Sequence, residues 1–425
     1  MHVLDACESL INGLSFLAVS VLRHTSRYHK LFRRRLLQLF LLTFVLWSSA
    51  DIFLVHRHFH EEQIHLDYKP PERQRIFIAS ALWDKERTIP SQWNDAFIEL
   101  TNVFGADNIF VSIYESGNSD GTRDALRKLD KALEGVGVQR KIIFAVSSSD
   151  NEALKNPPAD RRHIATRARL RNLSLRPLYD LRDAGTFFDR ILFLNDVVFT
   201  VGIASPYIPP LADVIGNQKE DVLSLLNTNY GTYTAACSFD ILNSPSGPDA
   251  LALRDADGHE NVMQKWPFFR SARSREAMKF MLPVPVRSCW GDMVFMGTEE
   301  IYSTRPYQFR GVPDGLADKH VVASESCLIH ADNYISKRRG VYLNPFVRVG
   351  YNTPAYAATR PENHWLSTWE IFESIWENRL RRWFSSPFLK EWSLRSRIAK
   401  WKAEDENNKE RGEFCLTNEV QATET

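Results

Sequence analysis

Short apolar stretches alternate with segments in which apolar residues recur every three or four positions, beginning near residue 76. The short stretches predict β-strands and the periodic segments predict helices, because side chains repeat every two residues in a strand and about every 3.6 residues in a helix. The expected strands are 76–79, 108–114, 141–146 and one that ends at Asn195, and the expected helices are 89–104, 120–133 and 161–181. Strands that alternate with such helices pair in parallel. The fold class is therefore expected to be α/β with a mostly parallel central sheet.

The strand that ends at Asn195 is the one on which function is expected to depend. Its apolar run, from Ile191 to Val197, is interrupted only by Asn195 and Asp196, which is typical of a strand buried on both faces. Ligands of open α/β sheets bind at the carboxyl ends of strands. A carboxylate such as Asp196 can hold Mg²⁺ or Mn²⁺ against the phosphates of a sugar nucleotide. The alternative is that Asn195 and Asp196 only cap the following turn.

A longer apolar stretch, residues 36–55, has the length of a membrane-spanning helix. Three arginines, Arg33 to Arg35, stand directly before it, whereas Glu61 and Glu62 follow soon after it. This asymmetry predicts a type II anchor, with the amino end in the cytosol and the bulk of the chain in a lumen. The alternative is a buried or interfacial hydrophobic helix.

These patterns divide the chain into parts: a cytosolic segment 1–35, the anchor helix 36–55, a polar stem 56–75, the α/β domain 76–360, an extension 361–401 and a tail 402–425. The extension carries aromatic and leucine side chains at spacings of three and four, which predicts one amphipathic helix: Trp365, Trp369, Phe372, Trp376, Leu380 and Trp383. Such a helix docks onto the domain or lies on a membrane. The charged tail is expected to be disordered.

Charge and cysteine usage exclude two classes of function. The 53 basic and 52 acidic residues give a formal net charge of +1, so no global field recruits nucleic acid. The five cysteines lack the spacing of a structural zinc site. Cys237, Cys289 and Cys327 fall within the domain and allow one disulfide in an oxidising compartment.

Several polar groups are candidates for substrate or metal contacts. The helix 161–181 carries arginines that can clamp phosphates or form a solvated face: Arg161, Arg162, Arg167, Arg169, Arg171 and Arg176. The same helix contains the glycosylation sequon that begins at Asn172. Asp255 and Asp257 form an Asp-x-Asp in a loop, which predicts a turn or a substrate-contacting loop. Trp290 suits the face of a sugar ring, and His330 can complete a metal shell or make an ordinary hydrogen bond.

Several segments, taken in order across residues 76–350, resemble the fungal capsule-associated α-1,3-mannosyltransferases of glycosyltransferase family 69. The matching segments are 76–79, 111–116 with Asp120 and Thr122, Arg171-Asn172, 193–197, 237–240, Arg254-Asp255 with Gly258, 288–290, Glu325 with Cys327, Asn344-Pro345 and 347–349. The family tends to have Cys-Trp-Asn-Gly where this chain has Cys289-Trp290-Gly291-Asp292. That difference bears on the preference for an acceptor.

The resemblance implies a GT-A-like fold, GDP-mannose as donor, a divalent ion such as Mn²⁺, a glycan acceptor, and residence in Golgi or other secretory membranes. It places Asp196 at the metal, with His330 and Asp332 as candidates for a second ligand. It also implies donor contacts from Ser112, Glu115, Ser116, Arg167, Arg169, Arg171 and Asn195, and acceptor contacts from Trp290, Arg254, Asp255 and Asp240.

Transfer from an α-linked donor to an α-linked product implies retention of configuration. Glu325, and after it Asp292, is the candidate to stabilise the cationic sugar or to receive the acceptor proton. Asn195 and Val197 stand where related folds have carboxylates, and this motivates a second hypothesis, a non-catalytic glycan-binding or scaffold subunit. A third, a cytosolic nucleotidyltransferase, is disfavoured by the arginines before the anchor.

Overall fold

The chain divides into two units, Met1–Arg57 and His58–Thr425. The computed structural model describes residues 28–61, 74–82, 93–116, 120–145, 159–201, 221–240, 251–260, 265–303, 307–359, 366–384 and 388–419. Helix α2 (Tyr28–Glu61) accounts for the described part of the first unit. Its segment Arg33–Arg57 is long and apolar enough to cross a membrane. Side chains such as Phe40 and Leu46 are exposed along it, which argues against a core helix of a soluble protein.

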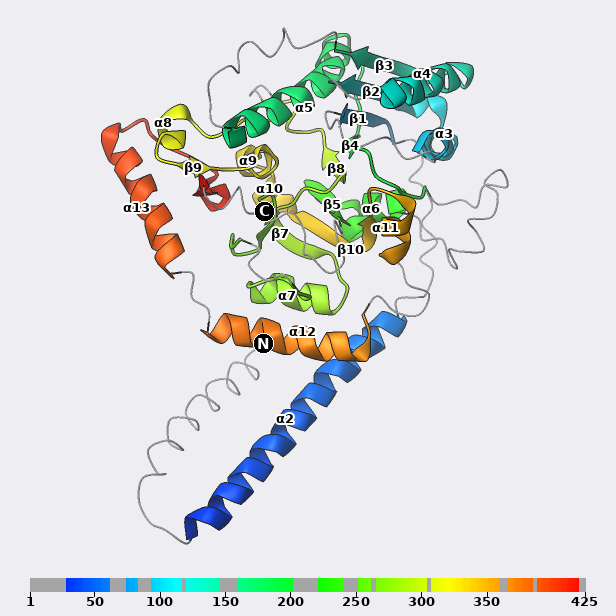
Figure 1. Cartoon of the computed structure of the whole chain (residues 1–425). Helices are drawn as coiled ribbons and strands as arrows, with labels where there is room; N and C mark the ends of the chain where they lie inside the picture. The colour runs from blue at the N-terminus through cyan, green and yellow to red at the C-terminus, as the bar shows by residue number, and fades with distance from the viewer. Residues whose placement is uncertain are drawn as a thin grey trace. The chain divides into compact units, whose positions relative to one another are not determined.

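The second unit is built on a nine-stranded sheet with the order β3-β2-β1-β4-β8-β5-β10-β7-β6 (Figure 1). Its first four strands are β1 (Ile76–Leu82), β2 (Ile109–Glu115), β3 (Gln139–Phe144) and β4 (Arg190–Leu194). All three pairings among them are parallel, and helices α3 (Trp93–Phe104), α4 (Asp120–Gly135) and α5 (Ala159–Asp183) lie between them in the chain. The predicted α/β class is therefore confirmed.

Both faces of the central strands β1 and β2 are covered, and these strands are largely apolar. Every residue of β1 and β2 is buried. Ile76 and Ile78 pack in the same core as α3 and α4, whereas Ala81 on the other face packs against Leu170 of α5. The period-two alternation of a strand thus separates the helices into two layers.

The rest of the sheet mixes both strand directions. It contains β5 (Ala235–Asp240), β6 (Arg254–Asp255), β7 (Val284–Ser288), β8 (Met293–Gly297) and β10 (Val341–Val349), with β8 antiparallel to both β4 and β5. The register between β10 and β5 shifts after Leu343, where Pro345 has no N–H to donate. The Asn344 side chain accepts a hydrogen bond from the Phe346 N–H at this irregularity (3.0 Å).

Shorter elements surround the sheet. They are η1 (Ala106–Asn108), α6 (Asp221–Leu226), η3 (Thr228–Gly231), α7 (Ala272–Lys279), α8 (Asp314–Ala317), β9 (Val321–Val322), α9 (Glu325–Asp332), α10 (Ser336–Arg339), α11 (Thr353–Ala358), α12 (Thr368–Phe384), α13 (Phe388–Glu404), η4 (Glu413–Cys415) and β11 (Thr417–Asn418). Helix α12 confirms that the described aromatic positions of the extension lie on one helix. Trp365 lies outside the described residues.

The carboxyl-terminal segment is ordered, so the expectation of a disordered tail is wrong for residues 402–419. Strand β11 pairs with β9, and a disulfide joins Cys327 of α9 to Cys415. Trp401 and Leu416 are buried in a small core with Leu328. The burial of a few apolar side chains and one disulfide stabilise this segment in spite of its many charged residues.

Candidate functional site

Asn195 and Asp196 follow β4 at the point where the chain reverses its direction across the sheet. The strands after β1 run outward to β3, and β4 then pairs with the opposite side of β1. Such a switch point is where open α/β sheets bind ligands, because the loops on either side diverge. Asp196 is half-buried there, as a side chain at the rim of a site would be.

Two side chains from neighbouring elements hold this strand end in place. Trp93 at the start of α3 donates its indole N–H to the Asn195 carbonyl (2.9 Å), and Ser80 of β1 donates to the Leu194 carbonyl. Both are buried. In the sequence, Trp93 is one of the periodic apolar positions of the predicted helix 89–104, and Ser80 was not predicted to have a role. A hydroxyl within an otherwise apolar strand was the signal that could have found the latter.

Asp292 lies directly opposite Asn195. The antiparallel register of β4 and β8 pairs Leu194 with Met293, so the next positions beyond the two strands face one another. The Asn195 N–H donates to the Asp292 carbonyl (2.8 Å), and the Asn195 side-chain amide donates to Asp292 Oδ1 (3.0 Å). The tip of the sheet thus carries Asp292, which is hydrogen-bonded to Asn195, and Asp196, the next residue along the chain.

This arrangement accounts for the spelling Asn-Asp-Val at the strand end. An aspartate at position 195 would set a second negative charge against Asp292, whereas the Asn195 amide donates a hydrogen bond to it. Val197 is fully buried in the main core, so its position cannot carry a charge. Related folds carry a second carboxylate at position 195 or 197. In this chain Asp292, which is hydrogen-bonded to Asn195, is the nearby carboxylate that can take its place.

The donor chemistry at this tip fits a hard divalent cation. Two carboxylates that leave coordination positions for phosphate oxygens are a usual protein contribution to Mg²⁺ or Mn²⁺ sites. Two groups of three potential ligands occur among the described residues, Cys237 with Cys289 and His330, and Asp255 with Asp257 and His259. Neither group contains Asp196. The described residues at the tip therefore do not form a complete set of three metal ligands, and the remaining ligands of a cation would come from the substrate.

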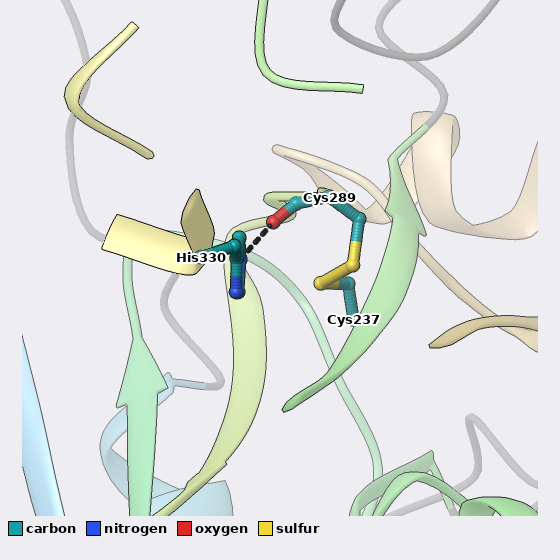
Figure 2. A group of neighbouring side chains, drawn as sticks. All are labelled: Cys237, Cys289 and His330. Carbon is teal, nitrogen blue, oxygen red and sulfur yellow. Dashed lines mark hydrogen bonds between the residues drawn. A yellow bond between two sulfur atoms is a disulfide. The ribbon is translucent and has the colours of Figure 1, made fainter. Parts of the chain in front are cut away.

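His330 belongs to a structural cluster with a disulfide, shown in Figure 2. Cys237 and Cys289 are joined to one another, so neither offers a thiolate to a metal. His330 Nε2 donates to the Cys289 carbonyl (2.8 Å), and its buried Nδ1 has no hydrogen-bond partner. The histidine thus ties α9 to the segment that leads to Asp292, and the structure groups it with the cysteines rather than with Asp196.

Burial lowers the pKa of His330 to about 4, although its hydrogen bond to Cys289 acts in the opposite direction. Acidification is therefore expected to destabilise the fold, because the unfolded chain binds a proton at this histidine below about pH 6.5 and the folded chain does not. The contribution of neutral His330 to the free energy of unfolding is fully present above pH 6.5 and is lost as the pH falls from 6.5 to about 4. The total loss is roughly 3 kcal/mol. Urea unfolding at pH 7, 6 and 5 checks this, with His330→Gln as control. Identical pH profiles for the two proteins would contradict it.

Asp332 makes a two-point ion pair with Arg310. The Arg310 guanidinium donates to both carboxylate oxygens of Asp332 (2.6 and 2.9 Å) and to both oxygens of Glu410 (2.8 and 2.9 Å). Burial acts to lower the pKa of Arg310, but these hydrogen bonds prevail and raise it. Asp332 thus joins α9 to the carboxyl-terminal segment, and its oxygens are engaged there.

Glu325 and Arg171 form a buried ion pair. Arg171 of α5 donates to Glu325 Oε1 and to the Ser326 hydroxyl, and its guanidinium lies 4.3 Å from the centre of the Trp290 ring. Glu325 is fully buried, and its Oε2 has no hydrogen-bond partner. Arg167 lies 3.7 Å from the same carboxylate. Arg171 thus packs against the Trp290 ring, and its positive charge is neutralised by Glu325.

Among the described basic side chains of α5, Arg169 and Arg176 are exposed. Arg169 and Arg176 line a cavity of about 490 Å³ between α5 and residues 308–311. Asn172 lines it too, and its side chain exchanges hydrogen bonds with the Phe309 backbone (2.8 and 2.9 Å). With Ser174 fully buried, the sequon is closed to glycosylation once the chain has folded.

The expected donor contacts on β2 reach the same edge of the sheet as Asp196. Leu82 pairs with Glu115 at the carboxyl ends of two parallel strands, and the Ser116 N–H donates to the Leu82 carbonyl (2.8 Å). Glu115 is buried and pairs with Arg123 (3.0 Å). Ser112 lies deeper, donating to the Ser174 carbonyl (2.6 Å).

The Arg254-Asp255 segment is committed to packing. Arg254 is fully buried and donates to the carbonyls of Phe414 (2.8 Å) and Cys415 (3.1 Å). Asp255 accepts hydrogen bonds from the N–H groups of Asp257 (3.0 Å), His259 (2.9 Å) and Ser271 (2.6 Å). Its Asp-x-Asp spelling therefore closes a turn. The expected acceptor contacts of these two residues are not brought to the tip that Asp196 occupies.

Trp290 and Asp240 are the remaining acceptor candidates. The Trp290 ring packs against Phe193 (5.1 Å between centroids) and Phe309 (5.4 Å), two residues before Asp292. Asp240 ends β5, and its side chain lies outside the described part of the structure.

Comparison with known proteins adds a family assignment. A family model described as Cryptococcal mannosyltransferase 1 matches residues 75–204 and 211–332, more than half of the chain. Among solved structures, the chain is similar to the mannosyltransferase PcManGT from Pyrobaculum calidifontis in complex with GDP-Man and Mn²⁺, with a TM-score of 0.35, 12% identity and 86% of each chain covered. It is also similar to GalNAc-T7 with UDP, GalNAc and Mn²⁺, with a TM-score of 0.33, 10% identity, and 78% of this chain and 54% of that chain covered. No curated protein matches it.

Proposed function

The chain belongs to the cryptococcal mannosyltransferase 1 family, and on that premise we propose that it transfers mannose from GDP-mannose to a glycan acceptor. The product linkage is α-1,3, formed with retention of configuration. The observation that carries the proposal is the placement of two acids at the switch point of the sheet: Asp292 is hydrogen-bonded to Asn195, and Asp196 follows Asn195 in the chain. Their oxygens fit a cation that also binds a nucleotide diphosphate.

The roles of the chain's own residues follow from their positions. When bound, a divalent cation such as Mn²⁺ supplies positive charge that stabilises the departing diphosphate. Asp196 and Asp292 would hold that cation. Trp93 fixes the end of β4, and Asn195 joins it to Asp292. Because Asp292 is half-buried at the tip and Glu325 is fully buried in an ion pair, Asp292 ranks ahead of Glu325 as the group that faces the sugar.

The same proposal includes a single-pass type II anchor in Golgi or other secretory-pathway membranes, with the domain in the lumen. The apolar segment Arg33–Arg57 and the arginines at its start support this orientation. Two disulfides, Cys237–Cys289 and Cys327–Cys415, suit an oxidising compartment.

A screen of sugar nucleotides with the full chain in detergent tests the proposal. We expect nucleoside diphosphate release from GDP-mannose in the presence of Mn²⁺ and its loss after chelation, with faster release when a mannoside acceptor is added. Glycan binding without turnover of any sugar nucleotide would instead support a non-catalytic subunit of a glycan-assembly complex.

Asp292→Asn is expected to lower mannosyl transfer by about 10²-fold, because it removes one of two anionic oxygen ligands while a carbonyl oxygen still accepts the Asn195 hydrogen bond. The unfolding temperature should change little, and steady-state GDP release measures the loss. The matched control is Asp257→Asn, which alters an exposed acid in the closed turn and should leave the rate unchanged. A fully active Asp292→Asn enzyme contradicts the assignment.

A further inference from the structure

Helix α12 has two apolar faces. Ile371 and Ile375 are buried on one face, and Lys265 of the same unit pairs with two glutamates of the helix, Glu373 and Glu377. On the opposite side, Trp369, Trp383 and Phe384 are 67%, 47% and 81% exposed. At about 100° per residue, the positions of the two sets fall on opposite sides of the helix axis. One face is thus sufficient for docking, and the aromatic one is additional.

The exposed face is continuous along the helix. Trp369 contacts Phe372 (5.4 Å between ring centroids), and Trp383 contacts Trp376 (6.4 Å). All four rings lie on the same side of the helix axis. Leu380 adds to this side with 48% exposure. Exposed apolar side chains that occur singly need no explanation, but a contiguous patch of this kind marks an interaction surface. We call the four exposed side chains on this side of the helix, Trp369, Leu380, Trp383 and Phe384, the aromatic face.

The composition of the aromatic face favours a lipid surface as its partner. Tryptophan is enriched at the boundary between lipid and water, because its ring is apolar while its indole N–H can still bind water or headgroups. The face presents two such rings, one near each end of α12, together with a leucine and a phenylalanine. An amphipathic helix of this kind lies in the plane of the interface, its apolar face among the headgroups.

The same chain carries the means to bring a membrane within reach. The helical segment Arg33–Arg57 can cross a bilayer, and residues 58–75 connect it to β1 at Ile76. Helix α2 continues to Glu61, and residues 62–75 span at most about 50 Å. The tethered unit therefore meets the bilayer as an intramolecular partner at high effective concentration. Under that condition a face of four side chains suffices to hold it.

We propose that the aromatic face of α12 lies on the lumenal leaflet of the membrane in which α2 is anchored. This second attachment fixes the orientation of the catalytic unit relative to the bilayer. The inference rests on the membrane anchoring that is part of the proposed function.

The experiment uses the full chain with a protease site inserted into residues 62–73, reconstituted in phosphatidylcholine vesicles and analysed by flotation before and after cleavage. The wild-type catalytic unit should remain with the vesicles after cleavage. The variant Trp369→Ser/Trp383→Ser/Phe384→Ser should be released, with at least a tenfold fall in the ratio of bound to free protein. The control Phe187→Ser/Leu282→Ser/Tyr334→Ser removes exposed apolar side chains elsewhere and should stay bound. Circular dichroism verifies that each variant is folded.

Each other outcome overturns the inference in a recognisable way. If the chain floats before cleavage but the wild-type unit is released afterwards, the anchor stands and the aromatic face is not a membrane contact. If the chain never floats, both the anchor and the face fail. If the released wild-type unit is a dimer by light scattering and the variant a monomer, the face binds a second copy of the chain.

Discussion

Replacing Asp196 by asparagine is expected to reduce mannosyl transfer by at least about 10³-fold without lowering the unfolding temperature. Asparagine retains the size of the side chain and can still cap a turn, so a purely structural role would tolerate it. It lacks the charge that holds a cation against two phosphates, and such interactions contribute several kcal/mol to stabilising the departing group. GDP release from GDP-mannose at saturating Mn²⁺ measures the effect.

A matched control separates charge at the tip from charge elsewhere on the sheet. Asp107 is exposed just before β2, at the amino ends of the parallel strands and therefore on the opposite edge from Asp196. Asp107→Asn should be fully active. Mn²⁺ binding, followed by calorimetry, should weaken in Asp196→Asn and not in Asp107→Asn. Unimpaired turnover by Asp196→Asn would leave the turn-capping interpretation in place.

Replacing Glu325 by alanine is expected to lower the free energy of unfolding by about 3–5 kcal/mol. The change removes the carboxylate that faces Arg171 and leaves that buried guanidinium uncompensated, which is the costly way to break a buried ion pair. Urea unfolding of the detergent-solubilised chain measures the loss. As a control, Glu413→Ala breaks the exposed pair with Lys402 and should cost no more than about 1 kcal/mol.

A double substitution tests whether the loss comes from the broken pair. Glu325→Leu with Arg171→Met removes both charges, and the combined loss should be clearly smaller than the sum of the two single losses. Additive losses would contradict this account. Glu325→Gln supplies a further distinction: a direct role in transfer requires the folded variant to lose turnover, whereas a supporting role allows turnover to persist in the protein that remains folded.

The part of the fold that local sequence encodes was predictable. The apolar runs of β1, β2 and β4 and the periodic spacing of Trp93, Phe97 and Leu100 in α3 each arise within a window of a few residues, and they give the parallel half of the sheet. The same window placed Asp196 at a strand end. The prediction that the tail is disordered was wrong. It relied on the charged composition of the segment, whereas Cys415 and Leu416 are buried against residues that are distant in the sequence.

The sequence named Asp292 only as the second candidate for the group at the sugar, and its position beside Asn195 could not be predicted. Asp292 reaches Asn195 across 97 residues only because β8 returns antiparallel to β4, and Glu325 meets Arg171 across 154 residues. The sequence instead suggested His330 and Asp332 as metal ligands and Asp255 as a contact to the acceptor. In the structure, His330 binds a backbone carbonyl, Asp332 binds an arginine and Asp255 binds backbone N–H groups.

The sequence by itself determined the α/β class, the apolar helix, the family resemblance and one acid at a strand end, because each depends on neighbouring residues or on ordered motifs. The tertiary structure alone decided which distant side chains meet that acid and which face of α12 stays exposed. Both depend on strand register and on long-range packing, where a shift of one residue exchanges the inner and outer faces of a strand.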